Sequence, residues 1–332
     1  NKNREIERLN GIYRNILDSN GVTLYEARAT LIDAHTLDVG GETVTAENIL
    51  IATGGKPQVW DTPGFEHAIV SDDAFYLEDR PDRVIVVGGG YIAVEFAGIF
   101  NGYGAETTLA YRGDTILRGF DMDVRTHLMG EMDKKGINLV LNTVIERIDK
   151  VDGGLNITLS DGKVQQVDQV LYAIGRVPNT KNMGLEEAGV KLNDSGAIVV
   201  DDYFRTSVDN IYALGDIIDR FQLTPVAIGE AMKLASNLFR GTQEKMDYAD
   251  IPTAVFSDPP IGTVGLTEED ARAQYGDVDI YRSTFRGLKD TLTGSTEQTM
   301  MKLIVDKASD KVLGCHMVGP DAGEITQGLG IA

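Results

Sequence analysis

The chain is nearly devoid of cysteine: Cys315 is the single one in 332 residues. One cysteine cannot form an intrachain disulfide, so the disulfide framework of many small exported proteins is excluded. The same count excludes a redox-active dithiol within these residues. Cys315 lies in an alternating apolar segment, 312–317, where a small buried thiol is the expected role.

Basic residues and long apolar runs are also scarce. Lys and Arg number 31 against 51 Asp and Glu, which gives a net charge of −20. This charge disfavours nucleic acid and anionic membrane surfaces as partners. No run of about 18 apolar residues occurs, so no membrane span is predicted. The four histidines have no metal-ligand spacing, and no metal site is expected at His35, His67, His127 or His316.

The most informative segment that is present is an apolar run, 84–87, followed by three glycines and an apolar helix over 92–100. Gly88, Gly90 and Ala93 occupy the three fingerprint positions of a dinucleotide-binding strand–turn–helix unit. Gly88 permits the tight turn, and Gly90 lets the backbone approach a pyrophosphate. The pyrophosphate would then lie on the N–H groups at the start of the helix, where the helix dipole favours negative charge.

The end of the next expected strand, 107–111, indicates which dinucleotide binds. An NAD site usually has an acidic residue there, which binds the ribose 2′-hydroxyl. Here the residue is Arg112, and Arg118 follows it in the same loop. Two guanidinium groups suit a 2′-phosphate, which they hold by charge-assisted hydrogen bonds. The sequence therefore predicts NADPH rather than NADH; the alternative is that both arginines are ordinary surface charges.

Hydrophobic periodicity predicts the remaining elements. Helices are expected over 6–17, 123–135, 225–239 and 268–275. Strands are expected over 49–55, 137–144, 170–176, 198–201, 211–214, 253–256, 279–285, 300–306 and 311–318, and β meanders over 22–51 and 145–168. The longer strands after residue 252 indicate a separate α+β domain.

Several segments occur in the order seen in the FAD- and pyridine-nucleotide-dependent disulfide oxidoreductases, a family that the chain resembles over its whole length. They are Ala52–Gly55, Gly88–Glu95, Ala173–Asn179 and Ala213–Asp216. The resemblance sharpens to the glutathione reductases, closest to the plant and cyanobacterial type. The segments that carry this closer resemblance are 90–95, 117–121, 179–182, 223–227, 259–268 and 285–289.

The resemblance implies an α/β fold with two nucleotide-binding Rossmann-like domains, one for FAD and one for NADPH, plus a C-terminal α+β dimerisation domain. The implied division is a partial FAD-binding domain at 1–55, an NADPH-binding domain at 56–178, a central domain completing the FAD site at 179–248, and a partial dimerisation domain at 249–332. A homodimer is expected. Cytoplasm is the expected location because the reaction needs NADPH, with an organelle as the alternative.

The resemblance also implies roles for single residues. Tyr91 matches the ring that covers the nicotinamide pocket, and Glu95 matches the carboxylate that pairs with a lysine beside the flavin. These two are the expected catalytic residues. Asp216 matches the acid that binds the flavin ribityl chain, and Thr224 lies near the flavin pyrimidine edge. Thr224 and Ile228 are the expected substrate contacts. The expected cofactor-binding residues are Gly88, Gly89, Gly90, Ile92, Arg112, Arg118, Gly175, Ala254, Ala29, Thr53, Gly54, Arg176, Asp216 and Thr224.

The implied reaction is the NADPH-dependent reduction of oxidised glutathione through FAD and a redox-active disulfide. The chain contains no Cys-x-x-x-x-Cys pair, no first GxGxxG motif and no C-terminal His-Pro motif of the family. The disulfide and the C-terminal general acid are therefore expected outside it. Many glutathione reductases have a substrate-binding arginine where this chain has Met232, although the plant-like forms also lack it.

Two alternatives stay open. The first is a related NADPH-dependent flavoprotein reductase for another disulfide, such as glutathione amide or a trypanothione-like substrate, which Met232 would permit. The second is a non-catalytic nucleotide-binding and dimerisation module. Residues 1–55 resemble half of a flavin domain and should expose a large apolar patch, which argues against this module.

Overall fold

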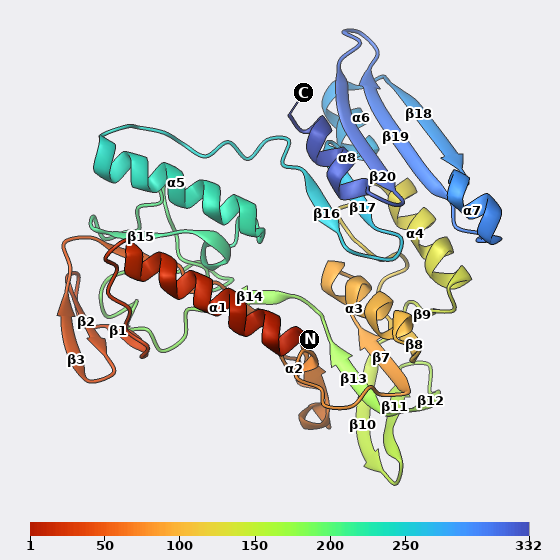
Figure 1. Ribbon diagram of the computed structural model, residues 1–332, viewed down its shortest axis with the longest axis horizontal. Helices are drawn as coiled ribbons and strands as arrows, with labels where there is room; N and C mark the ends of the chain where they lie inside the picture. The colour runs from red at the N-terminus through yellow and green to blue at the C-terminus, as the bar shows by residue number, and fades with distance from the viewer. Residues whose placement is uncertain (332) are drawn as a thin grey trace. The chain divides into compact units, whose positions relative to one another are not determined.

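The computed structural model describes residues 1–331, which fold into two compact units (Figure 1). Unit 1 consists of Asn1–Gly55 and Val177–Met246, and unit 2 consists of Lys56–Arg176 and the residues from Asp247 onward. Each unit is thus built from two separated segments of the chain. No helix among the described residues is long and apolar enough to cross a bilayer. The division into four segments by cofactor remains a prediction.

Unit 1 combines two small sheets with two long helices. Its elements are α1 (Lys2–Ser19), β1 (Ala29–Leu31), β2 (Thr36–Val39), β3 (Glu42–Thr45), β4 (Ile49–Ile51), β15 (Ile211–Ala213), the 3-10 helix η2 (Gly215–Ile218) and α5 (Thr224–Arg240). Strands β1–β3 form an antiparallel meander, whereas β4 and β15 pair in parallel with Ile49 opposite Ile211. The apolar side chains of β4 and β15 join those of η2 and α5 in one core.

The first segment of unit 2 contains the elements predicted to bind the dinucleotide. They are η1 (Phe65–His67), β6 (Ile69–Val70), α2 (Ser71–Ala74), β7 (Arg83–Val87), α3 (Tyr91–Gly102), β8 (Glu106–Ala110), α4 (Met122–Lys134), β9 (Asn138–Val140), β10 (Ile145–Val151), β11 (Gly154–Leu159), β12 (Val164–Val167) and β13 (Gln169–Tyr172). The strands β5 (Gly55–Pro57) and β14 (Arg176–Pro178) form a separate two-stranded sheet.

A five-stranded parallel sheet with the order β6-β13-β7-β8-β9 organises this segment. Side chains alternate across β7, because successive residues of a strand point to opposite faces. Val84 and Val86 join the core formed with α3 and α4. Ile85 and Val87 join a second core with the β10–β12 meander. The sheet is therefore covered on both faces, as parallel sheets usually are.

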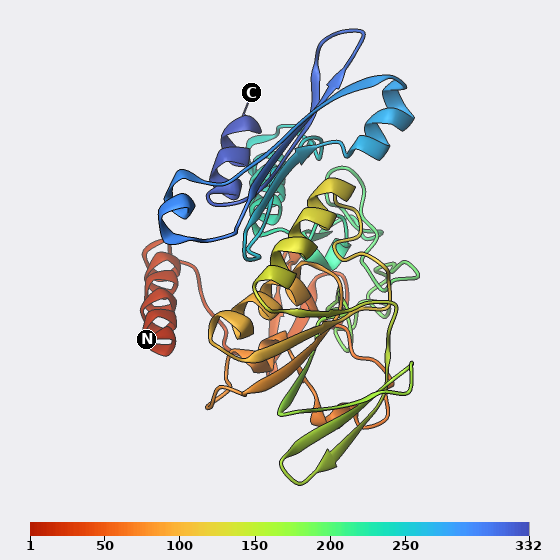
Figure 2. The same ribbon diagram turned by 90° about the vertical axis from the view of Figure 1, so that its right-hand side faces the viewer.

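The second segment of unit 2 is an antiparallel sheet with helices. Its elements are β16 (Thr253–Val255), β17 (Ile261–Gly265), α6 (Glu268–Tyr275), β18 (Val278–Phe285), α7 (Leu288–Thr293), β19 (Thr299–Asp306), β20 (Val312–Val318) and α8 (Ala322–Leu329). The strand order is β16-β17-β20-β19-β18. Figure 2 shows α8 on one side of this sheet and α6 on the other. Val255, Ile261, Met300 and Val318 share a core with α3 and α4.

Most predicted elements are confirmed, but several predicted β segments are wrong in whole or in part. The strands expected over 49–55 and 170–176 end at Ile51 and Tyr172. Residues 198–201 form no strand: Ile198 makes one isolated bridge with Leu192, and the Asn193 side chain accepts the N–H groups of Ser195 and Ala197 in the preceding turn. The strand expected over 137–144 ends at Val140, before Asn142 adopts a φ of 54°. Residues 22–28, expected to be β, precede the first strand of the meander.

Candidate functional site

The predicted dinucleotide turn lies at the carboxyl end of β7. Gly88 has a φ of 143°, and a Cβ atom there would lie 2.2 Å from the carbonyl oxygen of Ala173. At Gly89 a Cβ atom would lie 2.5 Å from the ring of Tyr111. Gly90, the N-cap of α3, has extended backbone and nothing within 4 Å of its Cβ position. The first two glycines are therefore required by the fold, whereas Gly90 leaves open space at the helix N-terminus.

This contrast predicts different outcomes for two alanine substitutions. Gly88→Ala should lower the melting temperature, because its methyl group meets backbone and its φ is strained for any other residue. Gly90→Ala should leave the melting temperature within a few degrees of wild type. It should nevertheless weaken NADPH binding, because the methyl group occupies the space that a pyrophosphate would fill.

Thermal unfolding and equilibrium NADPH titration of both variants check this prediction. A Gly90→Ala protein that binds NADPH as wild type does would contradict the pyrophosphate assignment. A Gly88→Ala protein of wild-type stability would contradict the steric argument.

The two predicted phosphate-binding arginines follow β8 in one loop of unit 2. Both side chains are exposed, and no hydrogen bond or ion pair to Arg112 or Arg118 occurs within residues 1–331. The β8 strand lies next to β7 in the sheet, so the loop begins at the same edge as the Gly88 turn. Two guanidinium groups are thus available to an anion beside the glycine turn.

Tyr91 and Glu95 both lie on α3. Tyr91 is the first residue of the helix, and 37% of its surface is exposed. The Glu95 carboxylate accepts a hydrogen bond of 2.9 Å from the backbone N–H of Phe256, which follows β16. Burial raises the pKa of the Glu95 carboxyl above its ordinary value, although this hydrogen bond opposes the shift. A half-buried carboxylate with one neutral donor would gain from a cationic partner.

Other predicted cofactor residues of unit 2 lie at several places. Gly175 follows β13, which pairs in parallel with β7, so it lies at the same edge as Gly88. Arg176 begins β14. Ile92 packs against the core beneath α3, and Ala254 lies opposite Gly262 in the antiparallel sheet. The roles of these four residues remain predictions.

The predicted flavin residues of unit 1 gather at the carboxyl edge of the parallel pair β4–β15. Thr53 and Gly54 follow β4, and Asp216 follows β15. The N–H of Leu214 donates to the carbonyl of Ile51 at 3.3 Å, so both strands end side by side. Thr224 and Ile228, both exposed, lie in the first turns of α5, and Ala29 begins β1 in the separate meander.

Glu230 is a structurally important residue that the sequence analysis did not assign. It is fully buried on α5, and its carboxylate accepts the N–H of Gly215 at 2.7 Å. Gly215 has a φ of 73° and precedes Asp216. The buried glutamate therefore fixes the turn that presents Asp216. An acidic residue on the apolar face of a predicted helix was the available signal, since buried carboxylates are rare unless bonded.

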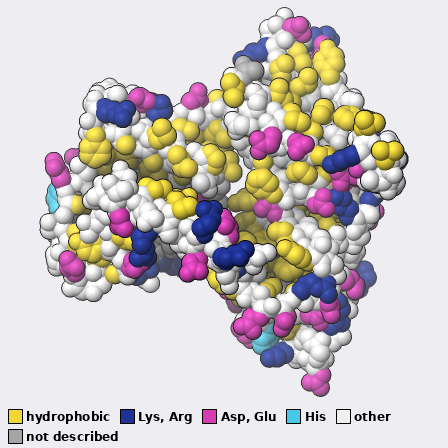
Figure 3. Space-filling view, in the orientation of Figure 1, with side chains coloured by type: hydrophobic (Ala, Val, Ile, Leu, Met, Phe, Trp, Pro, Cys, Tyr) yellow, Lys and Arg dark blue, Asp and Glu magenta, His cyan; other side chains and the backbone are white. Residues whose placement is uncertain are grey.

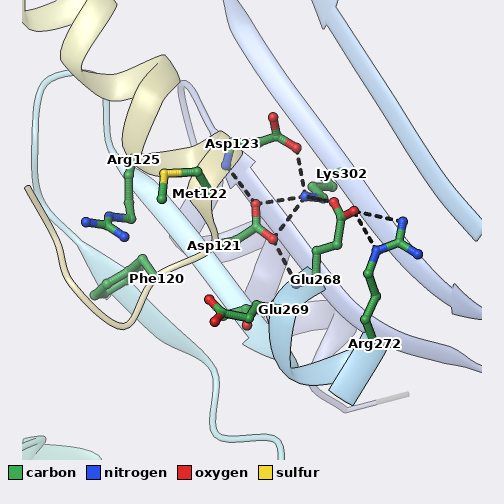
Figure 4. Close-up of a pocket in the computed structure, with 10 residues that line it drawn as sticks. Phe120, Asp121, Met122, Asp123, Arg125, Glu268, Glu269, Arg272 and Lys302 are labelled. Carbon is green, nitrogen blue, oxygen red and sulfur yellow. Dashed lines mark hydrogen bonds and ion pairs between the residues drawn. The ribbon is translucent and has the colours of Figure 1, made fainter. Parts of the chain in front are cut away.

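A cavity of about 350 Å³ in unit 2 is lined by a group of charged residues that the sequence analysis also did not assign to any role (Figure 4). The Lys302 ammonium is fully buried and bonds both oxygens of Asp121 at 2.9 and 3.0 Å. It also bonds Asp123 and Glu268, each at 2.7 Å. We call these four residues the Lys302 cluster. Asp121 also accepts the N–H groups of Asp123, in α4, and Glu268, in α6.

The contacts within the Lys302 cluster shift the pKa values of Asp121, Glu268 and Lys302. Burial opposes ionisation of Asp121, but the Glu268 N–H and the Lys302 ammonium outweigh it and lower the pKa of the carboxyl below 3.8. The hydrogen bond from Lys302 lowers the pKa of Glu268 below 4.5. Burial opposes the charge on Lys302 too, yet its carboxylate partners raise its pKa above 10.5.

These shifts predict how stability depends on pH. For a carboxyl whose pKa is lower in the folded state, the stabilisation is complete above its unfolded pKa and is lost as the pH falls through the folded value. The melting temperature of wild type should therefore fall once the pH drops below the unfolded values of 4.5 and 3.8. The melting temperature of Lys302→Met should fall less over the same pH range, because the ammonium group that helps to lower the pKa values of Asp121 and Glu268 is absent. Melting curves across this range check the difference; parallel curves would contradict it.

Cys315 lies in a strand as predicted, but it is partly buried rather than buried. It lies on β20, opposite Val264 on one side and Leu303 on the other. Burial raises the pKa of its thiol, so it stays protonated at neutral pH.

Comparison with known proteins agrees with this arrangement. Residues 2–231 match the family described as pyridine nucleotide-disulphide oxidoreductase, and residues 251–332 match the dimerisation domain of that family. The chain is 47% identical to a glutathione reductase, chloroplastic/mitochondrial, of Pisum sativum over 332 residues. That alignment covers 100% of this chain and 60% of the pea protein.

Two further relatives are similar to the chain over nearly its whole length. A glutathione reductase of a Nostoc species is 46% identical, with 99% of this chain and 75% of the relative covered. A trypanothione reductase of Leishmania donovani is 44% identical, with coverage of 99% and 70%.

A solved structure shares the fold of the chain. The HOCl-induced flavoprotein disulfide reductase RclA from Escherichia coli superposes with a TM-score of 0.90 at 27% identity, over 99% of this chain and 78% of that one. The chain thus contains a pyridine nucleotide-disulphide oxidoreductase domain followed by a dimerisation domain. The chain belongs to the pyridine nucleotide-disulphide oxidoreductase family.

Proposed function

We propose that the chain is part of an NADPH-dependent flavoprotein, a homodimer of the cytoplasm, that reduces oxidised glutathione. The chain spans 60% of the length of its pea relative, so this activity is proposed for the whole protein. The observation that carries the proposal is the pair of exposed, unbonded arginines, Arg112 and Arg118, beside the glycine turn of unit 2; the statement on bonding covers residues 1–331. Relatives named glutathione reductase at 43–47% identity support the substrate.

The residues of unit 2 fit NADPH. The open space at Gly90 accepts a pyrophosphate at the start of α3, where N–H groups face the anion. Arg112 and Arg118 would hold the 2′-phosphate. Tyr91, in the first turn of the same helix, would lie beside the nicotinamide, and Glu95 one turn later would orient a cation next to the flavin. When bound, the two cofactors would supply a hydride and carry its two electrons to a disulfide.

The residues of unit 1 fit part of an FAD site. Two turns, at Gly54 and Gly215, lie at the carboxyl edge of β4 and β15. Asp216 follows the second turn, and its neighbours in the sequence are buried. Asp216 would accept a hydrogen bond from a hydroxyl of the ribityl chain, and Glu230 would keep that turn in place. Thr224, at the start of α5, would contact the flavin edge and the substrate, together with Ile228.

The proposed disulfide lies outside this chain. Burial raises the pKa of the Cys315 thiol, and the residue lies within a sheet, so both features disfavour it in disulfide exchange. The thiolate that attacks oxidised glutathione therefore belongs to sequence not included in these residues.

A homodimer is supported by the dimerisation domain. Hydrophobic side chains gather over β18 and β19 in Figure 3. The register places Tyr281, Phe285, Met301 and Leu303 on one face, with exposed fractions of 58%, 42%, 37% and 38%. An apolar sheet face of this kind is typical of a protein interface. A second copy of the chain is the occupant that we propose.

A trypanothione-like substrate is the second candidate. Met232 is 67% exposed on α5, where many glutathione reductases have an arginine for a substrate carboxylate. Trypanothione reductases at 44–45% identity keep this candidate open.

The test is NADPH oxidation by the full-length protein with one disulfide at a time. Rapid turnover with oxidised glutathione and slow turnover with trypanothione disulfide would support the proposal. The reverse order would move the function to the second candidate. Flavin that NADPH does not reduce would overturn the oxidoreductase proposal altogether.

A further inference from the structure

The loop that connects β8 to α4 carries both proposed phosphate-binding arginines. Hydrogen bonds hold this loop in place at several points along its length. We call residues Arg112–Asp121 the arginine loop. Its first residues continue the edge of the sheet: Gly113 accepts the N–H of Asn142 at 3.0 Å. Its last residue, Asp121, belongs to the Lys302 cluster. Between these ends, two further contacts hold the part that precedes Arg118.

The first contact joins the arginine loop to the glycine turn. The N–H of Leu117 donates to the carbonyl oxygen of Gly89 at 2.6 Å. Leu117 is 1% exposed and has a φ of 54°, a left-handed conformation that costs free energy for a leucine. Arg118 directly follows this strained and buried residue. Its backbone is therefore fixed relative to the turn that would bind the pyrophosphate.

The second contact comes from Arg125 on α4. Its guanidinium donates two hydrogen bonds, one from Nε to the carbonyl of Ile116 at 2.6 Å and one from Nη2 to the carbonyl of Thr115 at 2.8 Å. Figure 4 shows Arg125 at one end of the cavity and Arg272 at the other. A guanidinium near the N-terminus of α4 opposes the helix dipole, so helix stability does not explain this residue.

We propose that Arg125 is a positioning residue that sets the preference for NADPH, by holding Arg118 at a fixed spacing from the Gly89 turn. This inference rests on the proposed function. A 2′-phosphate and a pyrophosphate of one dinucleotide lie at a defined separation, so both of their sites must be held at that separation. Prior ordering of the loop lowers the entropy lost when Arg118 binds phosphate. Arg125 itself binds the loop and not the nucleotide.

The test measures equilibrium binding of adenosine 2′,5′-bisphosphate and adenosine 5′-monophosphate to the full-length protein by calorimetry. Arg125→Leu should bind the bisphosphate about tenfold more weakly. Without Arg125 the loop no longer holds Arg118 in place, and the loss of the charge-assisted hydrogen bond between Arg118 and the 2′-phosphate has an effect of this size. Its affinity for the monophosphate should stay within about twofold of wild type. Arg125→Lys keeps the charge but cannot span two carbonyls, so its bisphosphate affinity should also fall.

Arg272→Leu is the matched control. Arg272 lines the same cavity but bonds Glu268 on α6, and its removal should change neither affinity. If Arg125→Lys binds both nucleotides as wild type does, long-range charge explains the effect and the positioning role is overturned. An equal loss for both nucleotides in the Arg125 variants would overturn it too. A wild-type protein without preference for the bisphosphate would instead refute the NADPH assignment of the proposed function.

Discussion

Replacing Arg112 and Arg118 together by alanine is expected to remove most of the preference for NADPH over NADH. Each exposed guanidinium is unbonded within residues 1–331 and is therefore available to a 2′-phosphate. A charge-assisted hydrogen bond contributes about 1.5–3 kcal/mol, which corresponds to about a tenfold to hundredfold change in affinity. NADH use should change little, because the glycine turn and the start of α3 remain. The measurement is kcat/KM for each dinucleotide in the full-length enzyme.

A control separates specific binding from a general loss of positive charge. Arg147 on β10 is 61% exposed and pairs with Asp149, so Arg147→Ala changes the net charge by one without altering the site. It should keep the wild-type preference. If the double variant also keeps the wild-type preference for NADPH over NADH, Arg112 and Arg118 do not bind the 2′-phosphate.

Lys302→Met is expected to lower the free energy of unfolding by about 3–5 kcal/mol, the usual effect of removing one partner of a buried ion pair. The substitution leaves Asp121, which is also fully buried, without its cation. Asp123 and Glu268 lose the same ammonium group and then repel each other and Asp121. Urea unfolding followed by circular dichroism at neutral pH measures the effect.

Lys307→Met is the comparison for this result. Lys307 pairs with Asp277 at the surface, with exposed fractions of 56% and 71%, and such pairs contribute about 0–1 kcal/mol. A Lys302→Met protein that loses no more stability than Lys307→Met would show that the buried cluster relaxes or hydrates without penalty.

The local parts of the site could be predicted from the sequence because their chemistry depends on neighbouring residues. Gly88 is required by the turn itself, Gly90 is the N-cap of α3, and Arg112 follows β8 closely, so their spacing in the sequence is enough to predict that all three lie at one edge of the sheet. The helices were predictable for the same reason: 268–275 has the expected bounds, with Thr267 as its N-cap. The predicted roles of Tyr91, Glu95 and Asp216 come from the family resemblance and still need direct tests.

The parts that sequence could not predict depend on contacts between distant residues. Lys302 is the only charged residue in the otherwise apolar run 300–305, and a lysine is ordinarily exposed, yet it is buried against Asp121, 181 residues away. Arg125 looks like an ordinary charged residue on a helix. Its role appears only when its two carbonyl partners are known. Residues 198–201 have a strand-like composition, but no neighbouring strand pairs with them beyond one bridge.

Each unit is built from two segments that are separated in the sequence, so its parts are synthesised at different times during translation. Strand β13 lies between β6 and β7, so the parallel sheet of unit 2 is complete when residue 172 leaves the ribosome. Strand β4 of unit 1 is made much earlier, but its partner β15 is not available until residue 213. During translation, β4 is therefore without its partner β15 until after the parallel sheet of unit 2 has been synthesised.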